Sequence, residues 1–551
     1  MIEKYVKTDF KSYEDFVKNY RIKVPKNFNF AFDVVDEIAQ KTPNKVAMVW
    51  CNEKGQEKNF TFKDIKEKSA QTANMLSFLG IKKGDAVMLM LKRHYEFWFS
   101  IIACHKIGAI AVPATHLLTV KDIIYRIKAA NIKTIISATD ERMITAINEA
   151  KNSVPILQNL INVQGEVEGW HNYSKELCRF SSFFPRPVGS EATTNDDPSL
   201  LYFTSGTAGY PKMVSHKFTY PLGHITTAKF WQNLNENSLH FTVADTGWGK
   251  AAWGKLYGQW ICEATVFVYD YERIDYHQLV KKIADYKITS FCAPPTVYRH
   301  IIKEDIKSYD LSNLKYAETA GEPLNPEVFN KFKEMTGLEL KEGFGQTETV
   351  VLIATFPWLK SKIGFLGKPA AGWDLDVVDE DGISCPPNQE GNLIVRTDKN
   401  IPVGLFCGYY ETPELTRAVW RNGVYNTNDR VCRDEEGYYR FISRADDLIK
   451  SSGYRIGPFE VESALIEHPA VLECAITGVK DEERGEIVKA TVILAKGYKA
   501  SPELVKELQE HVKKVTAPYK YPRLIEFVTE LPKTISGKIR RGQIRQQDGN
   551  K

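Results

Sequence analysis

Short apolar runs alternate with amphipathic stretches over the first 140 residues of the chain. Strands are predicted at residues 85–91, 109–112 and 133–137, and helices at residues 96–106 and 120–130. Strands and helices that alternate with short connections predict a parallel sheet with helices on both faces. Residues 140–197 have a less regular pattern, and residues 185–197 are typical of a loop.

The same alternation returns between residues 240 and 345. Strands are predicted at residues 239–244, 264–269 and 288–293, and a helix at residues 276–286. Polar and glycine residues follow the strands at 245–250, 320–323 and 343–349. Open α/β sheets bind ligands at the carboxyl ends of their strands, so these three segments are candidate ligand-binding segments.

The pattern changes twice towards the C-terminus. Residues 363–442 consist of short strands separated by Asp-Gly, Pro-Pro and Asn-Gly turns, which predicts a compact β subdomain. After residues 443–447 come helices at 458–468 and 502–515 and strands at 471–479, 487–495 and 524–528. We therefore expect an α/β protein in which residues 1–445 form a large domain of two α/β sheet subdomains plus the β subdomain. Residues 446–551 are expected to form a small, mobile α+β domain.

Composition places the chain among ordinary globular proteins. Its 551 residues are 43% hydrophobic and 26% charged, and a net charge of +4 does not by itself indicate a nucleic-acid partner. Residues 496–545 are more basic, with twelve Lys and Arg against five Asp and Glu, a local balance of 12 − 5 = +7. This local charge fits a phosphate-bearing ligand near the C-terminal end, although a solvated basic face is the commoner explanation.

Targeting signals and cysteine pairs are not evident. The nine cysteines include no Cys-x-x-Cys pair, which fits a reducing compartment rather than a disulfide framework or a zinc site. The N-terminal residues lack the apolar region of a signal peptide, and the longest apolar run is interrupted by His105 and Lys106. The sequence therefore predicts a cytoplasmic protein without a membrane span.

A glycine-rich stretch follows the apolar run at residues 198–203. It contains Thr204, Ser205, Gly206, Thr207, Ala208 and Gly209, and ends at Pro211 and Lys212. Glycine lets backbone N–H groups approach phosphate oxygens closely, and a lysine neutralises polyphosphate charge. The stretch is not a Walker A loop, and the chain has no Gly-x-Gly-x-x-Gly motif. A surface turn rich in Ser, Thr and Gly is the alternative interpretation.

Four stretches together give the sequence a family resemblance. They lie at residues 204–212, 343–349, 427–429 continuing to Arg455, and 532–538. In order and spacing they resemble the motifs of the adenylate-forming acyl- and aryl-CoA synthetase superfamily, and the resemblance covers essentially the whole chain. Residues 451–458 and 515–523 look most like the medium-chain acyl-CoA synthetases.

The resemblance implies a two-step reaction that uses ATP, Mg²⁺ and CoA. A carboxylate attacks the α-phosphorus of ATP to give acyl-AMP and pyrophosphate, and the CoA thiol then displaces AMP. Both steps concentrate negative charge, so the site needs preorganised cations and N–H donors.

The resemblance also assigns the nucleotide-binding residues. The β- and γ-phosphates would be held by Thr204, Ser205, Gly206, Thr207, Ala208, Gly209 and Lys212. The adenine pocket would be lined by Gly321, Glu322, Pro323, Glu342, Gly343, Phe344, Gly345 and Gln346.

Further positions would act on the phosphates and the ribose. Thr347 would contact the α-phosphate, and Glu348 would ligate Mg²⁺, which prefers hard oxygen donors. Asp429, assisted by Arg444, would bind the ribose hydroxyls. The catalytic residues Arg455 and Lys538 would approach the α-phosphate and the acyl carboxylate.

The C-terminal residues would bind CoA and move between the two steps. The CoA surface would consist of Ser452, Gly453, Tyr454, Arg484, Tyr521, Pro522 and Arg523. Asp446 would be the hinge about which the small domain swings.

Two positions depart from the family pattern. Ala208 stands where the loop usually carries Thr or Ser, which removes one phosphate-binding hydroxyl. Asn428 replaces the glycine of the usual Thr-Gly-Asp. Asn tolerates unusual backbone angles better than most residues, so we expect Asp429 still to reach the ribose.

The acyl pocket is predicted to be lined by Trp248, Lys250, Trp253 and Gly345. Acetyl-CoA synthetases close this pocket with a tryptophan just before Gln-Thr-Glu, where this chain has Gly345. We therefore expect short branched acids or acids of about four to eight carbons, since each buried methylene adds about 0.8 kcal/mol. On this interpretation Gly345→Trp would shift the preference towards acetate.

The sequence thus indicates an AMP-forming acyl-CoA synthetase for an aliphatic carboxylate. One alternative is an adenylating module that loads a separate carrier protein, since the chain ends thirteen residues after Lys538. Another is a non-catalytic protein that binds acyl nucleotides. We expect a monomer or small homo-oligomer.

Overall fold

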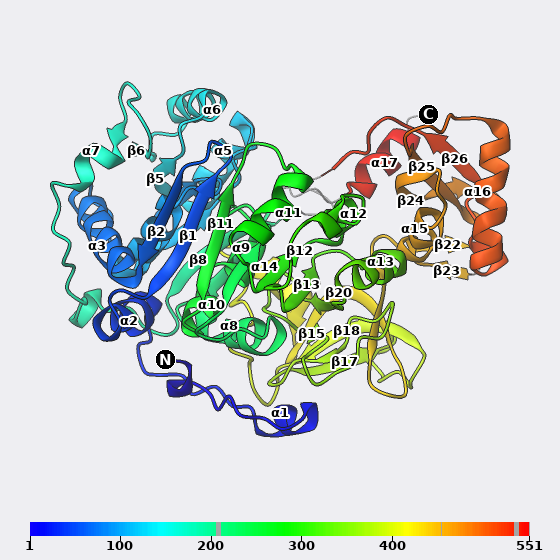
Figure 1. Ribbon diagram of the computed structural model, residues 1–551, viewed down its shortest axis with the longest axis horizontal. Coiled ribbons are helices and arrows are strands. Elements are labelled where there is room, and N and C mark those ends of the chain that lie inside the picture. Colours follow the sequence, from blue (N-terminus) through cyan, green and yellow to red (C-terminus); the bar gives the residue numbers. More distant parts are fainter. Residues whose placement is uncertain (205–210, 453, 534–538, 550–551) are drawn as a thin grey trace.

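A computed structural model of the protein describes residues 1–204, 211–452, 454–533 and 539–549. Three of its sheets lie in the first 444 residues and the fourth in the C-terminal region (Figure 1). The expected α/β fold, with two sheet subdomains, a β subdomain and a small α+β C-terminal domain, is confirmed.

The first sheet has seven strands in the order β7-β6-β5-β3-β4-β8-β9. Its strands are parallel except for the β8–β9 hairpin. They are β3 (Ala86–Met90), β4 (Ile110–Pro113), β5 (Ile132–Ser137), β6 (Asn159–Asn162), β7 (His171–Asn172), β8 (Pro198–Thr204) and β9 (Lys212–Lys217). The predicted strands at 85–91, 109–112 and 133–137 correspond to β3, β4 and β5.

The second sheet has nine strands in the order β16-β15-β14-β13-β12-β10-β11-β1-β2. They are β1 (Val46–Asn52), β2 (Glu57–Thr61), β10 (Leu239–Thr242), β11 (Thr265–Asp270), β12 (Ser290–Ala293), β13 (Tyr316–Ala320), β14 (Leu340–Phe344), β15 (Ile353–Ala354) and β16 (Lys368–Pro369). Strands β1 and β2 come from the N-terminal part of the chain and join this sheet through the parallel pairing of β1 with β11. The second sheet is therefore not built from one continuous part of the chain.

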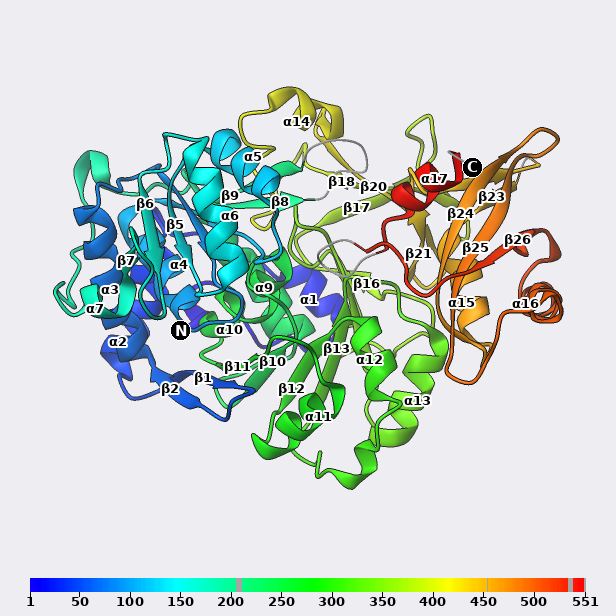
Figure 2. The ribbon, with the colours of Figure 1, turned by 90° about the horizontal axis from the view of Figure 1, so that it is seen from above.

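Helices cover both large sheets and occupy the space between them (Figure 2). They are α1 (Tyr13–Asn19), α2 (Glu37–Lys41), α3 (Phe62–Phe78), α4 (Glu96–Ile107), α5 (Val120–Ala130), α6 (Glu141–Asn152), α7 (Tyr173–Leu177), α8 (Tyr220–Ile225), α9 (Gly249–Gly254), α10 (Tyr257–Ile261), α11 (Tyr276–Asp285), α12 (Pro295–Ile301) and α13 (Pro326–Thr336). Every residue of α4 is buried, including His105 and Lys106. The largest apolar cluster joins α4 to α8, α10 and the N-terminal segment.

Local sequence signals explain where several helices begin and end. The α5 helix begins with a capping box, in which Thr119 accepts from the backbone of Asp122 and Asp122 accepts from the backbone of Thr119. The helix ends at Asn131, whose φ of 50° is in the left-handed region. Residues 140–197, for which the sequence predicted no element, include α6, β6, β7 and α7, which are too short to carry a clear periodicity.

The β subdomain consists of β17 (Asp374–Val378), β18 (Glu390–Arg396), β19 (Trp420–Arg421), β20 (Val424–Arg433) and β21 (Tyr439–Arg444), with α14 (Pro413–Val419) beside them. The C-terminal region consists of β22 (Ile449–Ser451), β23 (Tyr454–Ile456), α15 (Pro458–Ile466), β24 (Val471–Asp481), β25 (Gly485–Leu494), α16 (Pro502–Val515), β26 (Leu524–Phe527) and α17 (Arg541–Gly549). Strand β21 pairs with the β subdomain, whereas β22 pairs with the C-terminal sheet. The chain thus changes sheet between residues 444 and 449.

Candidate active site

The predicted phosphate-binding stretch connects the two strands of the β8–β9 hairpin. Thr204 ends β8 and is paired in register with Lys212, which begins β9. The ammonium group of Lys212 lies 4.9 Å from the centre of the Tyr409 ring. Ser205, Gly206, Thr207, Ala208 and Gly209 lie outside the described residues, so the contribution of these residues to the site remains a prediction.

Glu348 lies in the turn that follows β14, beside the same tyrosine. Its Oε1 accepts a hydrogen bond of 2.9 Å from the Tyr409 hydroxyl. Burial raises the pKa of Glu348 above its usual value, and the Tyr409 hydrogen bond and the nearby Arg444 and Lys212 oppose that rise. The turn therefore holds a carboxylate in a partly desolvated place, next to a cation and a hydroxyl.

This carboxylate fits a Mg²⁺ ion that is bound mainly through nucleotide phosphates. Mg²⁺ takes one or two protein carboxylates and completes its shell with phosphates and water. Glu348 can accept from Tyr409 through Oε1 and offer Oε2 to a metal. The described residues contain no cluster of three or more metal-ligating side chains, which such a site does not need.

Asp429 and Arg444 pair across neighbouring strands of the β subdomain. Arg444 Nη1 lies 2.9 Å from Asp429 Oδ1, and the Gln346 amide donates to Asp429 Oδ2 over 2.6 Å. Asn428 has a φ of 57°, in the left-handed region that favours glycine. Asn428 thus adopts a backbone conformation typical of glycine, and Asp429 lies beside Arg444. That Asp429 reaches the ribose stays a prediction. Arg444 Nε also lies 3.8 Å from Asp446, the predicted hinge.

The predicted adenine segments follow β13 and β14. Gly321 has a φ of 100°, and the Glu322 carboxylate accepts from the Thr296 hydroxyl over 2.6 Å. Pro323 and Phe344 are half-buried, and Gly343 packs against an indole. Glu342 is buried, which raises its pKa to about 8, so at neutral pH its carboxyl group is mainly protonated.

The predicted acyl-pocket segment lies against both of these segments. Lys250 donates to the carbonyl of Ala320, the residue before Gly321. A Cβ built on Gly249 would lie 3.4 Å from Thr347 Cγ2, so the start of α9 contacts the Thr347 turn directly. The three segments that follow β10, β13 and β14 therefore lie together, as their positions after the strands predicted.

Gly345 does not open the acyl pocket in the way the sequence suggested. A Cβ at this position would lie 2.5 Å from Trp253 Cη2 and 2.6 Å from the carbonyl oxygen of Val350. The Trp253 ring thus fills the space beside Gly345. The expectation that Gly345→Trp shifts the preference towards acetate stays a prediction, but a side chain at this position would meet Trp253 and the backbone of Val350. Trp248 is half-buried at the entry to α9.

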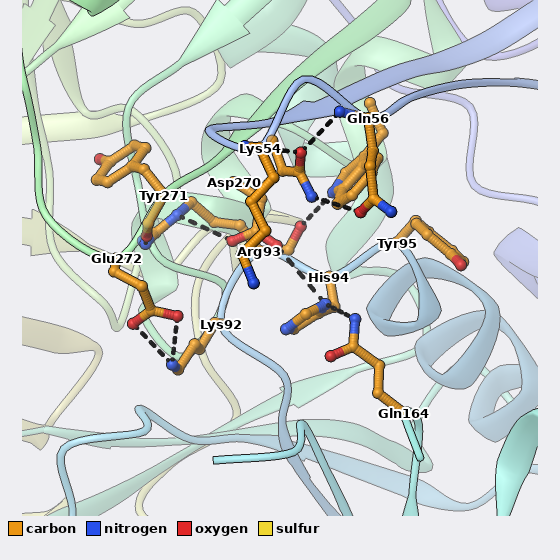
Figure 3. A network of polar contacts seen from close by, with 12 residues as sticks. Lys54, Gln56, Lys92, Arg93, His94, Tyr95, Gln164, Asp270, Tyr271 and Glu272 are labelled. Carbon is orange, nitrogen blue, oxygen red and sulfur yellow. Dashed lines mark hydrogen bonds and ion pairs between the residues drawn. The ribbon is translucent and has the colours of Figure 1, made fainter.

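A charged junction joins the two large sheets next to this segment (Figure 3). Lys92 Nζ lies 3.0 Å from Glu272, and His94 Nδ1 lies 3.6 Å from Asp270, so residues after β3 contact residues at the end of β11. Arg93 donates to the Tyr271 carbonyl and lies 3.5 Å from Asp245. Asp245 opens the acyl-pocket segment, so this junction fixes the segment to the first sheet.

The predicted CoA surface gathers on the C-terminal domain. Ser452 N donates to the Arg484 carbonyl over 2.8 Å, and the half-exposed Tyr454 ring stacks on Tyr519 at 4.1 Å. Arg523 donates to the Tyr521 hydroxyl over 2.8 Å. The Pro522 carbonyl accepts from Gln509 over 3.0 Å. These contacts form an aromatic and basic surface, a combination that suits a nucleotide with phosphates.

The remaining predicted residues are partly described. Arg455 lies on β23, paired in register with Lys450 of β22. Gly453 and Lys538 lie outside the described residues. The described residues Lys533 and Ile539 pair in an antiparallel β-bridge.

The prediction from sequence missed three residues of the site: Tyr409, His216 and Trp231. Tyr409 lies beside Glu348, His216 contacts the Thr347 carbonyl, and the Trp231 ring packs on Gly343. No motif marks Tyr409 or Trp231. His216 follows Lys212 at a spacing of four, which places both on one face of β9, and this was the one available signal.

The structure combines three sheets around a cluster of carboxylates, hydroxyls and a lysine with a small α+β C-terminal domain. This combination is typical of the AMP-binding class of enzymes. The chain belongs to the AMP-binding enzyme family: the family model matches residues 35–410, and the model of its C-terminal domain matches residues 460–538.

Proteins similar to this chain include acyl-CoA synthetases and an anthranilate CoA ligase. The chain is 41% identical over 550 residues to acyl-coenzyme A synthetase ACSM3, mitochondrial, of Homo sapiens, covering 98% of this chain and 93% of the relative. It is 42% identical over 535 residues to acyl-coenzyme A synthetase ACSM4, mitochondrial, of Homo sapiens, covering 95% of this chain and 91% of the relative. The crystal structure of the anthranilate CoA ligase AuaEII with anthranoyl-AMP superposes with a TM-score of 0.88 at 28% identity, covering 96% of this chain and 98% of the ligase.

The comparisons confirm the resemblance and the expected enzyme class, an ATP-dependent acyl-CoA synthetase. Enzymes of this class use a carboxylate, ATP, Mg²⁺ and CoA, as the sequence indicated. Among the described residues, no helix is both long and apolar enough to cross a membrane.

Proposed function

We propose that the enzyme converts an aliphatic carboxylate, ATP and CoA to acyl-CoA, AMP and pyrophosphate through an acyl-adenylate. The observation that carries this proposal is the convergence of Lys212, the Thr347–Glu348 turn and the Asp429–Arg444 pair. A cation beside a half-buried carboxylate suits a nucleotide's phosphates and metal, and a carboxylate fixed 2.9 Å from a guanidinium suits its ribose.

Each group has a distinct task in the first half-reaction. Lys212 offsets phosphate charge, the Thr347 hydroxyl donates to the α-phosphate, and Asp429 accepts from the ribose hydroxyls. Glu348 holds Mg²⁺, which when bound neutralises phosphate charge. Arg455 and Lys538 hold the carboxylate substrate in line with the α-phosphorus. Both residues supply positive charge where negative charge develops in the transition state.

The acyl chain occupies the space bounded by Trp248, Lys250 and Trp253. Trp253 fills the volume next to Gly345 and limits the depth of the pocket. We propose acids of about four to eight carbons or short branched acids, because an indole wall gives apolar contact area while excluding long chains. A preference for acetate or for palmitate-length acids, measured as kcat/KM, would contradict this assignment.

We propose residues 1–445 and 446–551 as the two domains, with Asp446 as the hinge that presents the CoA surface in the second half-reaction. The change of sheet between residues 444 and 449 supports this boundary. Asp446→Pro fixes φ at the hinge and should slow thioester formation more than adenylation. Equal loss of both steps would argue against the hinge.

An adenylating module that loads a carrier protein is the second candidate function. The aromatic and basic surface around Tyr454, Tyr519 and Arg523 favours CoA, because a nucleotide offers both a ring to stack and phosphates to pair. A non-catalytic role is set aside by the enzyme class.

Pyrophosphate release with a panel of carboxylates, with and without CoA, tests the proposal. We expect turnover that needs both an aliphatic acid and CoA. Turnover with amino acids, or with a carrier protein in place of CoA, would favour the second candidate.

We also propose a cytoplasmic location, because the spread of nine cysteines without a Cys-x-x-Cys pair fits a reducing compartment. The names of the human relatives include the word mitochondrial, which is a statement about those proteins. Fractionation of the source cells with an antibody against the chain decides between the two compartments.

A further inference from the structure

His216 faces the Thr347–Glu348 turn from the strand that carries Lys212. Alternate side chains of a strand share one face, so Lys212, Val214 and His216 lie on the same side of β9. Val214 packs with Leu352 in the apolar cluster beside the turn. His216 is fully buried, and its Nε2 lies 2.8 Å from the carbonyl oxygen of Thr347.

The chemistry of this contact fixes the tautomer of the imidazole. Burial lowers the pKa of His216 to about 3, so the ring is neutral at physiological pH. A carbonyl oxygen can only accept, so Nε2 carries the hydrogen and donates it to Thr347. Nδ1 is buried and has no hydrogen-bond partner among the described residues. All the polar interaction of this side chain is therefore directed at the turn.

The turn depends on this donor for one of its carbonyl groups. The Gln346 carbonyl accepts from Thr349 N over 3.2 Å, and the Glu348 carbonyl accepts from Phe406 N over 2.7 Å. Backbone groups thus hold the carbonyls on either side, and a side chain holds the carbonyl of Thr347. The orientation of this peptide determines where the Thr347 hydroxyl and the Glu348 carboxylate point.

We propose that His216 is a positioning residue for the nucleotide: it holds the Thr347 carbonyl so that Thr347 and Glu348 face the phosphates and metal of MgATP. It touches neither substrate nor metal and acts through the turn. The inference rests on the proposed function. It also ties the strand of Lys212 to the turn of Glu348, so that the two phosphate-binding elements keep a fixed separation.

A purely structural role for His216 is the competing explanation. Its ring stacks on Tyr220 at 3.7 Å, within a buried cluster that includes His224. Packing and donation can be separated by substitution. His216→Phe keeps a planar ring in the cluster and removes the donor, whereas His216→Gln loses the ring and keeps an N–H donor of similar reach. His224→Phe is the matched control, because His224 is equally buried in this cluster and its ring forms a hydrogen bond with Thr227.

The test measures carboxylate-dependent exchange of labelled pyrophosphate into ATP without CoA, with KM for MgATP and KM for the carboxylate determined separately. We expect H216F to raise KM for MgATP about tenfold, the usual effect of losing one buried hydrogen bond, with little change in KM for the carboxylate. H216Q should stay within about threefold of the unsubstituted enzyme, although it loses the ring, and H224F should leave KM for MgATP unchanged.

Two results would overturn the inference: an H216F variant with normal KM for MgATP, or an H216Q variant as impaired as H216F. Thermal unfolding establishes that each variant is folded. If H216F does not fold, H216M, which has similar volume and no N–H donor, replaces it in the same comparison. An unsubstituted enzyme without carboxylate-dependent exchange would overturn the proposed function itself, which distinguishes the two failures.

Discussion

Asp429 and Arg444 face each other in register across strands β20 and β21, with 2.9 Å between Oδ1 and Nη1. Gln346 binds the other carboxylate oxygen of Asp429, so the side chain is held from both sides. A carboxylate held in a fixed position is the kind of acceptor that ribose hydroxyls need, which is the role we propose for Asp429.

Asp429→Ala should therefore raise KM for ATP by about 10–100-fold, since a hydrogen bond to a charged group contributes about 1.5–3 kcal/mol. Steady-state kinetics at saturating carboxylate measures this. Asp374→Ala is the control, because Asp374 is an exposed carboxylate on the same subdomain. An unchanged KM for ATP in the Asp429 variant would remove the ribose assignment.

Trp253 and Gly345 are in direct contact, which makes Trp253 the residue to change when the acyl preference is tested. Trp253→Leu should move the optimum towards longer acids, because each additional buried methylene adds about 0.8 kcal/mol, roughly fourfold in kcat/KM. Gly345→Trp should instead lose stability and activity with every acid. A carboxylate panel on both variants measures this, and an unchanged optimum in the Trp253 variant would place the pocket elsewhere.

The Tyr409 hydroxyl lowers the pKa of Glu348 by hydrogen bonding, whereas burial raises it. Tyr409→Phe removes the lowering contribution, so the pKa of Glu348 rises further. Glu348 must be ionised to hold Mg²⁺, so as pH falls, kcat/KM for MgATP should decline at a higher pH than in the unsubstituted enzyme. Tyr410→Phe, at the adjacent position, should leave the acidic limb in place. If the pH profiles of kcat/KM for MgATP are the same for the Tyr409 variant and the unsubstituted enzyme, this hydroxyl does not affect the pKa of Glu348.

Lys538 distinguishes the two half-reactions. Its role comes from the family resemblance, since it lies outside the described residues. Lys538→Ala should reduce adenylation by about 10²–10³-fold, the usual loss of one preorganised donor, and should change thioester formation from supplied acyl-AMP little. A general catalytic role predicts equal loss in both steps, and a solvated lysine predicts no loss in either.

Much of the fold could be predicted because many elements carry strong local signals. The α5 helix has a capping box and an apolar face, and it spans the predicted residues 120–130. The pairing of β1 with β11 could not be predicted, because residues more than two hundred positions apart form that contact and both strands are simply apolar. The short elements within residues 140–197 were missed for the opposite reason, since they have too few residues for a period to emerge.

Site residues could be predicted where they belong to a family motif. They could not be predicted where tertiary packing alone brings them to the site. Asp429 and Arg444 were assigned from the family resemblance, and they do pair. Tyr409 contacts Glu348 through its hydroxyl, and Trp231 contacts Gly343 through its indole. The sequence around these two residues does not indicate that they belong to the site. The space beside Gly345 could not be predicted from the sequence either, because it is filled by Trp253, a residue ninety-two positions away.

The exchange of labelled pyrophosphate into ATP tests the central claim most directly, because it reports the reversible formation of an acyl-adenylate. We predict that exchange requires Mg²⁺ and an aliphatic carboxylate of about four to eight carbons and proceeds without CoA. Exchange that begins only when CoA is added, or nucleotide turnover that yields ADP and phosphate, would contradict the account.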